Sequence, residues 1–321
     1  MIKVKKLLKS NYAAWDAFVL GANNGTIFHL RDFLNYHPKN KFKDYSLELY
    51  KANSLLSVLP AAEVIKNNKK LLISHPGTSF ASFVTKEDLS IKDSLEIVEK
   101  IIEWTRKEGF DGIQLKIPPA FYSKRLSNYI EYALLSNGFN YFNREVTSTL
   151  FIEKNEEQIL KKFKSSHSRA VRKSENLGVE IKITDRVGEF FSILEKNLKI
   201  RHGASPTHTI DELESLMRIF PNSINIFGAF YEDQMIAGVL NFIVKEDVAL
   251  AFYISHKNEY QELRPLNLLF FNVFKWATKQ KIKVYDFGTF TVDGTANMGL
   301  GRFKENFGAS GVFRDSFQIL F

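Results

Sequence analysis

The chain has 321 residues, of which 45% are hydrophobic and 25% charged, a composition typical of a globular protein with a sizeable core. Its formal net charge is +8, and it contains no cysteine, which excludes disulfide frameworks, zinc–thiolate sites and cysteine nucleophiles. The length predicts two domains of roughly 150 residues each. Because the sequence shows neither a signal peptide nor an uninterrupted apolar run of about 18 residues, we expect a cytoplasmic protein.

An internal repeat organises the chain. Residues 46–75 and 225–256 each read as three apolar strands separated by two polar turns. A helix follows each segment, carrying Trp104 in the first half and Trp276 in the second, and a further strand follows each helix. This shared order predicts a duplicated α+β unit.

A basic helix is predicted at the start of the second half, over residues 156–178. Arg172 and Lys173 lie three and four residues after Arg169, a spacing that predicts one shared helix face for the three side chains. These side chains could grip a diphosphate, or an RNA backbone by charge alone. The alternative is a solvated basic face, which is the more frequent role of a single run of charges.

A glycine-rich segment near the C-terminus, residues 297–308, carries Phe303 and Lys304 at its centre. Glycine permits close approach of the backbone to a ligand. A lysine fixed among aromatic residues is well placed to neutralise an oxyanion or a phosphate. The alternative is a surface loop whose lysine is merely solvated.

Two other segments contain candidate ligand-binding residues. Pro265 marks the start of a helix, which places Arg264 beside the positive end of that helix, where an anion can bind. His208 lies in a loop ahead of a helix that begins near Asp211, as either a substrate contact or a structural hydrogen-bond partner. Neither cysteine nor a cluster of acids accompanies His208, so no metal site is predicted. Walker, GxGxxG, GxSxG and HExxH motifs are absent, which gives little support to hydrolase triads or nucleotide-driven chemistry.

The sequence resembles a known protein family in four segments, residues 163–179, 206–209, 265–288 and 300–308. The last, LGRFKENFG, is similar to the G-x-x-x-F-K-x-x-F-G element of the Fem-type aminoacyltransferases. The resemblance extends over nearly the whole length, and it includes the polysaccharide-associated relatives of these enzymes in the GNAT superfamily.

The resemblance implies a fold and a domain arrangement. The implied fold is α+β, with two tandem GNAT-like domains, each a mixed, mostly antiparallel sheet flanked by helices. The first domain is expected over residues 1–150 and the second, with the Phe-Lys-Glu-Asn-Phe-Gly element, over residues 151–312. A final strand, residues 313–321, is expected to return to the first domain.

The resemblance also implies roles for particular residues. Lys304 would stabilise the developing charge of the transition state, with Phe303 beside it. Arg169 and Arg172 would contact phosphates of the acceptor, and Tyr253 would line the substrate channel. The remaining expected contacts are His37, His208 and Asn267 for the substrate and Arg264 for the acyl donor.

The sequence departs from the family pattern in two places. Relatives often carry a glutamine near the first helix and a lysine eight residues later, where this chain has His29 and His37, with Phe33 between them. The pyrophosphate-binding sequence [QR]-x-x-G-x-[GA] of simple GNAT enzymes is absent before either repeat helix. The usual thioester donor is therefore not specified by the sequence.

Taken with the resemblance, the sequence predicts an acyl- or aminoacyltransferase that forms an amide on an amine of a cell-wall (peptidoglycan) precursor or a cell-surface carbohydrate. An acyl-CoA-dependent N-acyltransferase for amino sugars of polysaccharide biosynthesis is a second reading. A non-catalytic protein that binds RNA or another anionic ligand is a third. The expected donor is aminoacyl-tRNA or acyl-CoA, with no permanently bound cofactor and no metal, and we expect weak association with the inner membrane face.

Overall fold

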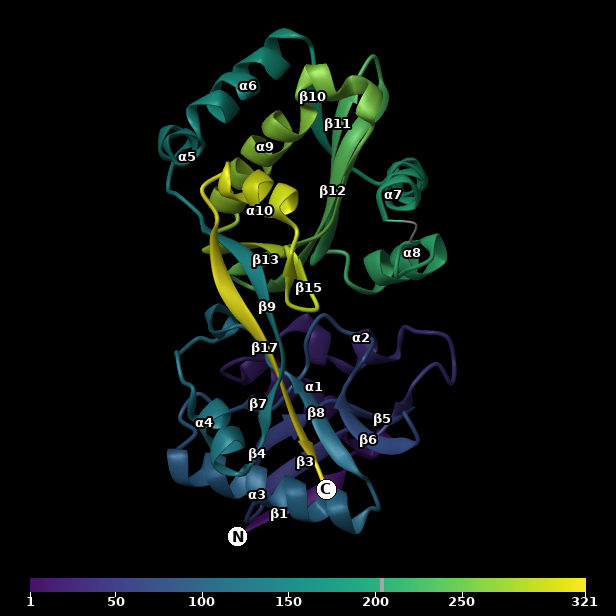
Figure 1. Cartoon of the computed structure of the whole chain (residues 1–321), viewed down its shortest axis with the longest axis vertical. Coiled ribbons are helices and arrows are strands. Elements are labelled where there is room, and N and C mark those ends of the chain that lie inside the picture. The colour runs from purple at the N-terminus through teal and green to yellow at the C-terminus, as the bar shows by residue number, and fades with distance from the viewer. Residues whose placement is uncertain (203–204) are drawn as a thin grey trace. The chain divides into compact units, whose positions relative to one another are not determined.

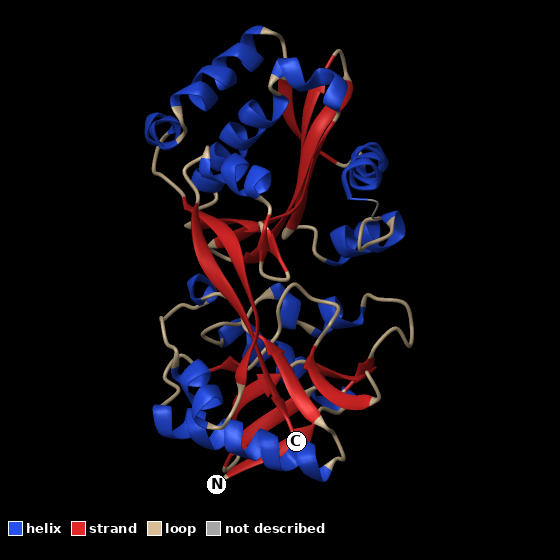
Figure 2. Ribbon diagram, in the orientation of Figure 1, coloured by secondary structure: helices blue, strands red, loops and turns tan. Residues whose placement is uncertain are grey.

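The computed structural model describes residues 1–202 and 205–321. It divides into two compact units, the first comprising residues 1–145 and 313–321 and the second residues 146–312. Figure 1 labels the elements of both units, and Figure 2 distinguishes helices from strands. No helix in the described part of the chain is long and apolar enough to cross a membrane.

Unit 1 has helices on the faces of two sheets. Its helices are α1 (Tyr12–Gly21), α2 (Arg31–Asn35), α3 (Ile91–Lys107) and α4 (Tyr129–Ser136). Its strands are β1 (Ile2–Lys6), β2 (Lys43–Asp44), β3 (Leu47–Lys51), β4 (Ser54–Leu59), β5 (Ala61–Lys66), β6 (Lys69–Ser74), β7 (Val84–Thr85) and β8 (Gly112–Lys116). Two long strands, β9 (Asn140–Phe151) and β17 (Ser310–Leu320), each contain residues of both units.

The first repeat segment, residues 46–75, contains four strands rather than the predicted three. Its middle strand is divided at Pro60 into β4, which pairs with β3 and β7, and β5, which pairs with β2 and β6 in the other sheet. Proline has no N–H to donate to a ladder, so a strand breaks readily at this residue. The Pro60 carbonyl instead accepts a hydrogen bond from the backbone N–H of His75 at 3.1 Å.

Unit 2 is built around a single large sheet with the strand order β10-β11-β12-β13-β14-β9. Its strands are β10 (Glu180–Thr184), β11 (Ile224–Tyr231), β12 (Gln234–Lys245), β13 (Val248–His256) and β14 (Val284–Thr289), with a small hairpin of β15 (Thr291–Val292) and β16 (Thr295–Ala296). Its helices are α5 (Glu156–Lys162), α6 (Ser165–Asn176), α7 (Val187–His202), α8 (Ile210–Ile219), α9 (Pro265–Lys279) and α10 (Met298–Glu305).

Helices cover both faces of this sheet. Ala237 and Val239 of β12 belong to the hydrophobic core formed with α9. Gly238, which lies between them, faces α7, because a Cβ there would lie 2.6 Å from the ring of Phe190. Since successive strand residues point to opposite faces, α9 and α7 pack on opposite sides of the sheet. Phe270 and Phe274 of α9 are fully buried in the core.

Strands β13 and β14 are paired in parallel over only part of their length. Val248–Leu250 pair with Val284–Asp286, while β13 continues to His256 and β14 to Thr289. Unit 1 repeats this arrangement, because Leu71–Ile73 of β6 pair in parallel with Gly112–Gln114 of β8. In each unit a long helix, α3 or α9, connects the two parallel strands.

Besides the divided strand at Pro60, two more segments differ from their sequence-based interpretation. The helix predicted over residues 156–178 is two helices, α5 and α6, because Phe163 is extended (φ −71°, ψ 143°) and inserts its ring into the core. Segment 297–308, considered above as a surface loop, contains helix α10, whose start is capped by the Asn297 side chain accepting from the N–H of Leu300.

Candidate functional site

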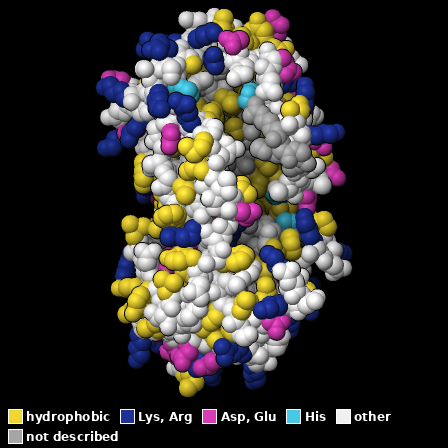
Figure 3. Space-filling view, viewed as in Figure 1, with side chains coloured by type: hydrophobic (Ala, Val, Ile, Leu, Met, Phe, Trp, Pro, Cys, Tyr) yellow, Lys and Arg dark blue, Asp and Glu magenta, His cyan; other side chains and the backbone are white. Residues whose placement is uncertain are grey.

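Helices α6, α9 and α10 line a cavity of about 590 Å³ in unit 2. Its cationic lining residues are Arg169 and Lys173 of α6 and Arg264 at the start of α9. Asn267 and Phe303, two more of the predicted site residues, also line it. Among the described lining residues none is acidic, and the nearby Glu262, outside the lining, lies 3.8 Å from the Lys173 ammonium and 4.0 Å from the Arg264 guanidinium. Three cations and one carboxylate leave this part of the cavity with a net positive charge. Lys and Arg side chains gather over α5 and α6 in Figure 3.

The start of α9 shapes one end of the cavity. Arg264 adopts a left-handed conformation (φ 55°) as the N-cap, and Pro265 occupies the first turn. Because Pro265 has no N–H and the N–H of Asn267 donates to the Arg264 carbonyl at 3.1 Å, this end offers fewer backbone donors than a helix start normally does. No acidic side chain occupies the first turn of α9. An anion here would therefore be held mainly by side-chain cations.

His167 is a further wall residue of the cavity. Its ring packs edge-on against Phe307, with centroids 5.3 Å apart. Burial lowers the pKa of His167, and the nearby charges of Lys164 and Arg264 lower it further. The imidazole is therefore neutral near pH 7, and protonation would add a positive charge to an already cationic wall.

Lys304 lies on α10 with its side chain buried, at 2% exposure. Its ammonium donates to the backbone carbonyl of Gly288 at 2.7 Å and to that of Thr289 at 2.8 Å, both at the end of β14. Phe303 packs beside it against Phe270 and Phe307. The predicted pair therefore lies where β14 has parted from β13, with Phe303 facing the cavity.

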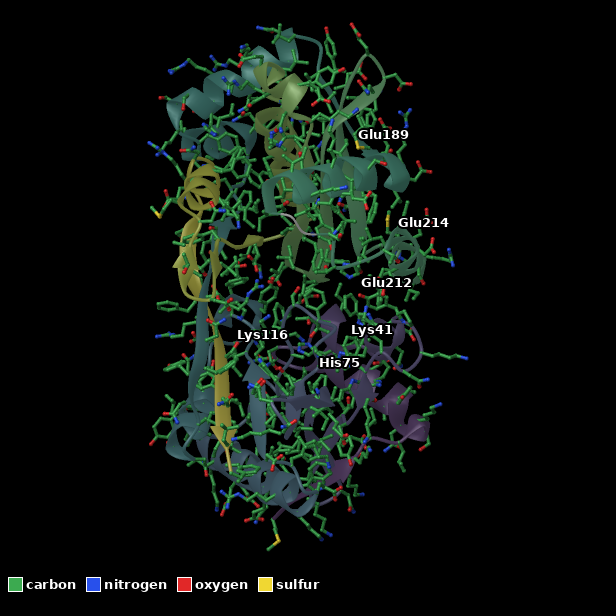
Figure 4. All side chains as sticks on the ribbon, turned by 45° about the vertical axis from the view of Figure 1, so that its right-hand side comes forward. Lys41, His75, Lys116, Glu189, Glu212 and Glu214 are labelled. Atoms are coloured by element: carbon green, nitrogen blue, oxygen red, sulfur yellow. The ribbon has the colours of Figure 1, made fainter. Side chains whose placement is uncertain are left out.

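His208 and Tyr253 meet in a different place. Four groups surround the Tyr253 hydroxyl: the backbone N–H groups of Thr207 (3.1 Å) and His208 (3.3 Å), the Thr207 hydroxyl (2.6 Å) and the His208 ring Nδ1 (2.9 Å). Burial raises the pKa of Tyr253, so the phenol is protonated at neutral pH. This cluster fixes the segment ahead of α8 to β13. Figure 4 labels Glu212 and Glu214 on α8 and Glu189 on α7.

Like Lys304, His208 and Tyr253, two more predicted residues lie outside the cavity lining. Arg172 points elsewhere on α6 and is exposed. His37 belongs to unit 1, where its ring lies 3.2 Å from the Gly77 carbonyl and stacks on His75 with centroids 6.2 Å apart. Burial lowers the pKa of His75 to about 4, so its ring is neutral. Figure 4 labels His75 after β6 and Lys116 at the end of β8.

Sequence reasoning missed the partners of Lys304. Nothing in the sequence indicates that carbonyls accept from a lysine, although Gly288, which ends the Tyr-Asp-Phe-Gly segment, was a signal of unusual backbone there. It also missed His256 and Gln261 as wall residues, because His256 was notable only for its place in the repeat. Within the described residues, no three His, Asp or Glu side chains gather as a metal site would require.

Comparison with known proteins agrees with this geometry. Residues 161–305 match a family model described as an acetyltransferase (GNAT) domain. The matched residues contain the parallel strands β13 and β14 and every lining residue of the cavity, so the part of the chain that holds the candidate site is similar to a GNAT domain. No curated protein sequence matches the chain significantly.

Solved structures extend the comparison to the whole chain. The structure of FemX superposes with a TM-score of 0.75 at 14% identity, covering 99% of this chain and 97% of that one. L-PGS from Bacillus licheniformis gives 0.61 at 10% identity, covering 98% and 92%. A tandem GNAT protein from the clavulanic acid biosynthesis pathway gives 0.56 at 9% identity, covering 100% and 98%. The chain thus has the tandem GNAT fold of the Fem type, which confirms the predicted fold class.

Proposed function

We propose that the protein transfers an acyl or aminoacyl group to an amine of a cell-wall precursor or cell-surface carbohydrate. The observation that carries this proposal is the cationic cavity with Phe303 in its wall and Lys304 directly beside it in sequence. Positive side chains hold the phosphates of an activated donor there, and a buried ammonium lies next to the place where its carbonyl would react.

The chemistry requires no covalent intermediate with the protein. The amine nitrogen attacks the carbonyl carbon of an ester or thioester, a C–N bond forms, and negative charge develops on the carbonyl oxygen. The bond to the oxygen or sulfur leaving group then breaks, and that group receives the proton that the amine loses. Holding both substrates together supplies much of the acceleration, and a cation at the developing charge supplies another large part.

Lys304 is our choice for that cation, with Phe303 shaping the wall beside it. Two carbonyls fix its ammonium in a nearly dry environment. A fixed charge in such surroundings stabilises an oxyanion more strongly than a solvated one, because it needs no reorganisation and is poorly screened. Arg169 and Arg264 would hold phosphates, and Asn267 would contact the substrate at the start of α9.

Two donors fit, for different reasons. Aminoacyl-tRNA is favoured by the side-chain cations on α6 and by the shortage of backbone donors at the start of α9, where a pyrophosphate cradle would need them. Acyl-CoA, with an amino sugar as acceptor, is favoured by the acetyltransferase description of residues 161–305. The proposal includes a cytoplasmic site of action, and the net charge of +8 supports weak attraction to an anionic membrane surface.

The test is a transfer assay with each donor. Purified protein is incubated with radiolabelled aminoacyl-tRNA or acetyl-CoA and amine-bearing cell-envelope precursors, and label in amide linkage is measured. In the productive combination, Lys304→Met should lower turnover by about 10²-fold or more, while the exposed Lys279→Ala serves as a matched control. Donor binding without transfer to any acceptor would instead support the non-catalytic RNA- or anion-binding reading.

A further inference from the structure

A buried carboxylate lies close in sequence to the carbonyls that hold Lys304. Asp286 of β14 is 0% exposed. Its Oδ1 accepts hydrogen bonds from the Thr147 hydroxyl of β9 and from the backbone N–H of Gly288, the latter at 2.8 Å. Burying a carboxylate is costly unless donors surround it, so a chain that keeps one here gains something from the contacts.

These contacts hold an irregular piece of backbone. Asp286 pairs with Thr149 of β9, yet the next paired residue of β14 is Thr289, opposite Thr147. The two intervening residues, Phe287 and Gly288, therefore bulge out of the ladder, and Gly288 adopts a left-handed conformation (φ 75°). A β-bulge changes the direction in which neighbouring groups point. Here the side chain of Asp286 connects the bulge to β9 through its hydrogen bond from the Thr147 hydroxyl.

The bulge determines where the next two carbonyls point. Those of Gly288 and Thr289 both face the ammonium of Lys304, at 2.7 and 2.8 Å. In a regular strand, successive carbonyls point in opposite directions and could not both reach one ammonium. The left-handed Gly288 lets them converge, and the Gly288 N–H bond to Asp286 holds that conformation.

We propose that Asp286 is a positioning residue for Lys304, acting through the bulge at residues 287–288. Thr147 and Asp286 lock the bulge, the bulge aligns the two carbonyls, and the carbonyls fix the ammonium of Lys304, whose sequence neighbour Phe303 lines the cavity. The catalytic consequence rests on the proposed function. The structural link between Asp286 and the ammonium does not, and it can be measured in the free protein.

The exchange of the Lys304 ammonium protons with water reports this positioning directly. In protein labelled with ¹⁵N-lysine, a buried and hydrogen-bonded ammonium exchanges slowly with water and gives an NMR signal, which Lys304→Arg identifies by its loss. We expect Thr147→Val, which removes the hydroxyl but keeps the shape, to speed the exchange of this signal about tenfold. Asp286→Ala and Gly288→Ala should abolish it.

Matched variants separate positioning from general destabilisation. Thr147→Ser keeps the hydroxyl and should restore the signal. Thr149→Val removes a hydroxyl from the same strand, where Thr149 is 1% exposed and its hydroxyl lies 3.5 Å from the Ser310 carbonyl, and should leave the signal unchanged. Thermal melts confirm folding, and Thr147→Val carries the test if Asp286→Ala does not fold.

The outcomes are distinguishable from those of the transfer assay. An unchanged Lys304 signal in folded Thr147→Val and Gly288→Ala, or no such signal in the folded wild type, would overturn the positioning role whatever the activity. If the signal responds as expected and no acyl transfer is found, the positioning role stands and the proposed function fails. Where transfer is found, Thr147→Val should lower kcat with KM unchanged, because donor contacts lie elsewhere.

Discussion

The two units contain the same parallel strand pair and connecting helix, but the helices begin differently. In unit 1, Ser90 caps α3, and Asp93 lies in its first turn, paired with Lys51 at 2.7 Å. In unit 2, Asn267 occupies the position of α9 that Asp93 occupies in α3, three residues after the N-cap. The positive end of α3 is thus neutralised by its own carboxylate, whereas that of α9 is not. This difference favours the start of α9 over that of α3 as the place where an anion would bind.

The largest expected effect comes from giving α9 the carboxylate that α3 has. Asn267→Asp places a negative charge in the cavity wall at the helix start, and it should weaken binding of deacylated tRNA or coenzyme A about 10- to 100-fold at low salt. Fluorescence anisotropy for tRNA, or calorimetry for coenzyme A, measures the change. Asn267→Ser is the neutral control. Equal affinity of the Asp and Ser variants would show that phosphate does not bind at this helix start.

Next in size is the loss of a single cation from the cavity. Arg169→Ala should weaken tRNA binding about tenfold and reduce the salt dependence of the affinity, because one fewer phosphate is neutralised. Arg172→Ala is the matched control from the same helix, since Arg172 does not line the cavity. If the two variants lose equal affinity, nucleic acid contacts the exposed face of α6 rather than the cavity.

The duplicated architecture and the importance of Lys304 could be predicted from the sequence. Repeated strand patterns and the two tryptophan-bearing helices predicted the duplication, and the Phe-Lys-Glu-Asn-Phe-Gly segment drew attention to Lys304. The break of the strand at Pro60 could have been predicted, because proline has no N–H to donate to a ladder, but three unbroken strands were expected there. The separation of the predicted helix into α5 and α6 at Phe163 could not be predicted from the sequence, because the Phe163 ring turns inward to pack against aromatic side chains that come from distant parts of the chain. The carbonyls facing Lys304 depend on a bulge between strands about 140 residues apart in the sequence, and no local pattern specifies such a pairing.

The reverse substitution in unit 1 should act on stability rather than binding. Asp93→Asn removes the charge that faces Lys51 and the helix start, and should lower the free energy of unfolding by about 1 kcal/mol at pH 7. The hydrogen bond from Lys51 lowers the pKa of Asp93, so this contribution is present above the ordinary carboxyl pKa of 3.8 and is lost as the pH falls through the lowered value. Chemical denaturation at pH 7 and pH 3 measures it. A difference between wild type and variant that is as large at pH 3 as at pH 7 would contradict the electrostatic origin.

The smallest expected effect, a few-fold change, concerns pH and affects unit 2 alone. Burial and neighbouring cations lower the pKa of His167 below 6.5, so its ring gains a proton only in acid. Because a bound phosphate favours the charged imidazolium, affinity for tRNA should rise as the pH falls from 7 to 5.5. His167→Gln keeps a polar side chain that cannot be protonated, and should remove the His167 part of that rise. His37→Gln, in unit 1, is the control and should leave the pH profile unchanged if phosphate binds only beside α9. A profile that depends on His37 instead would place an anion site in unit 1 and contradict the expectation that phosphate binds only beside the start of α9.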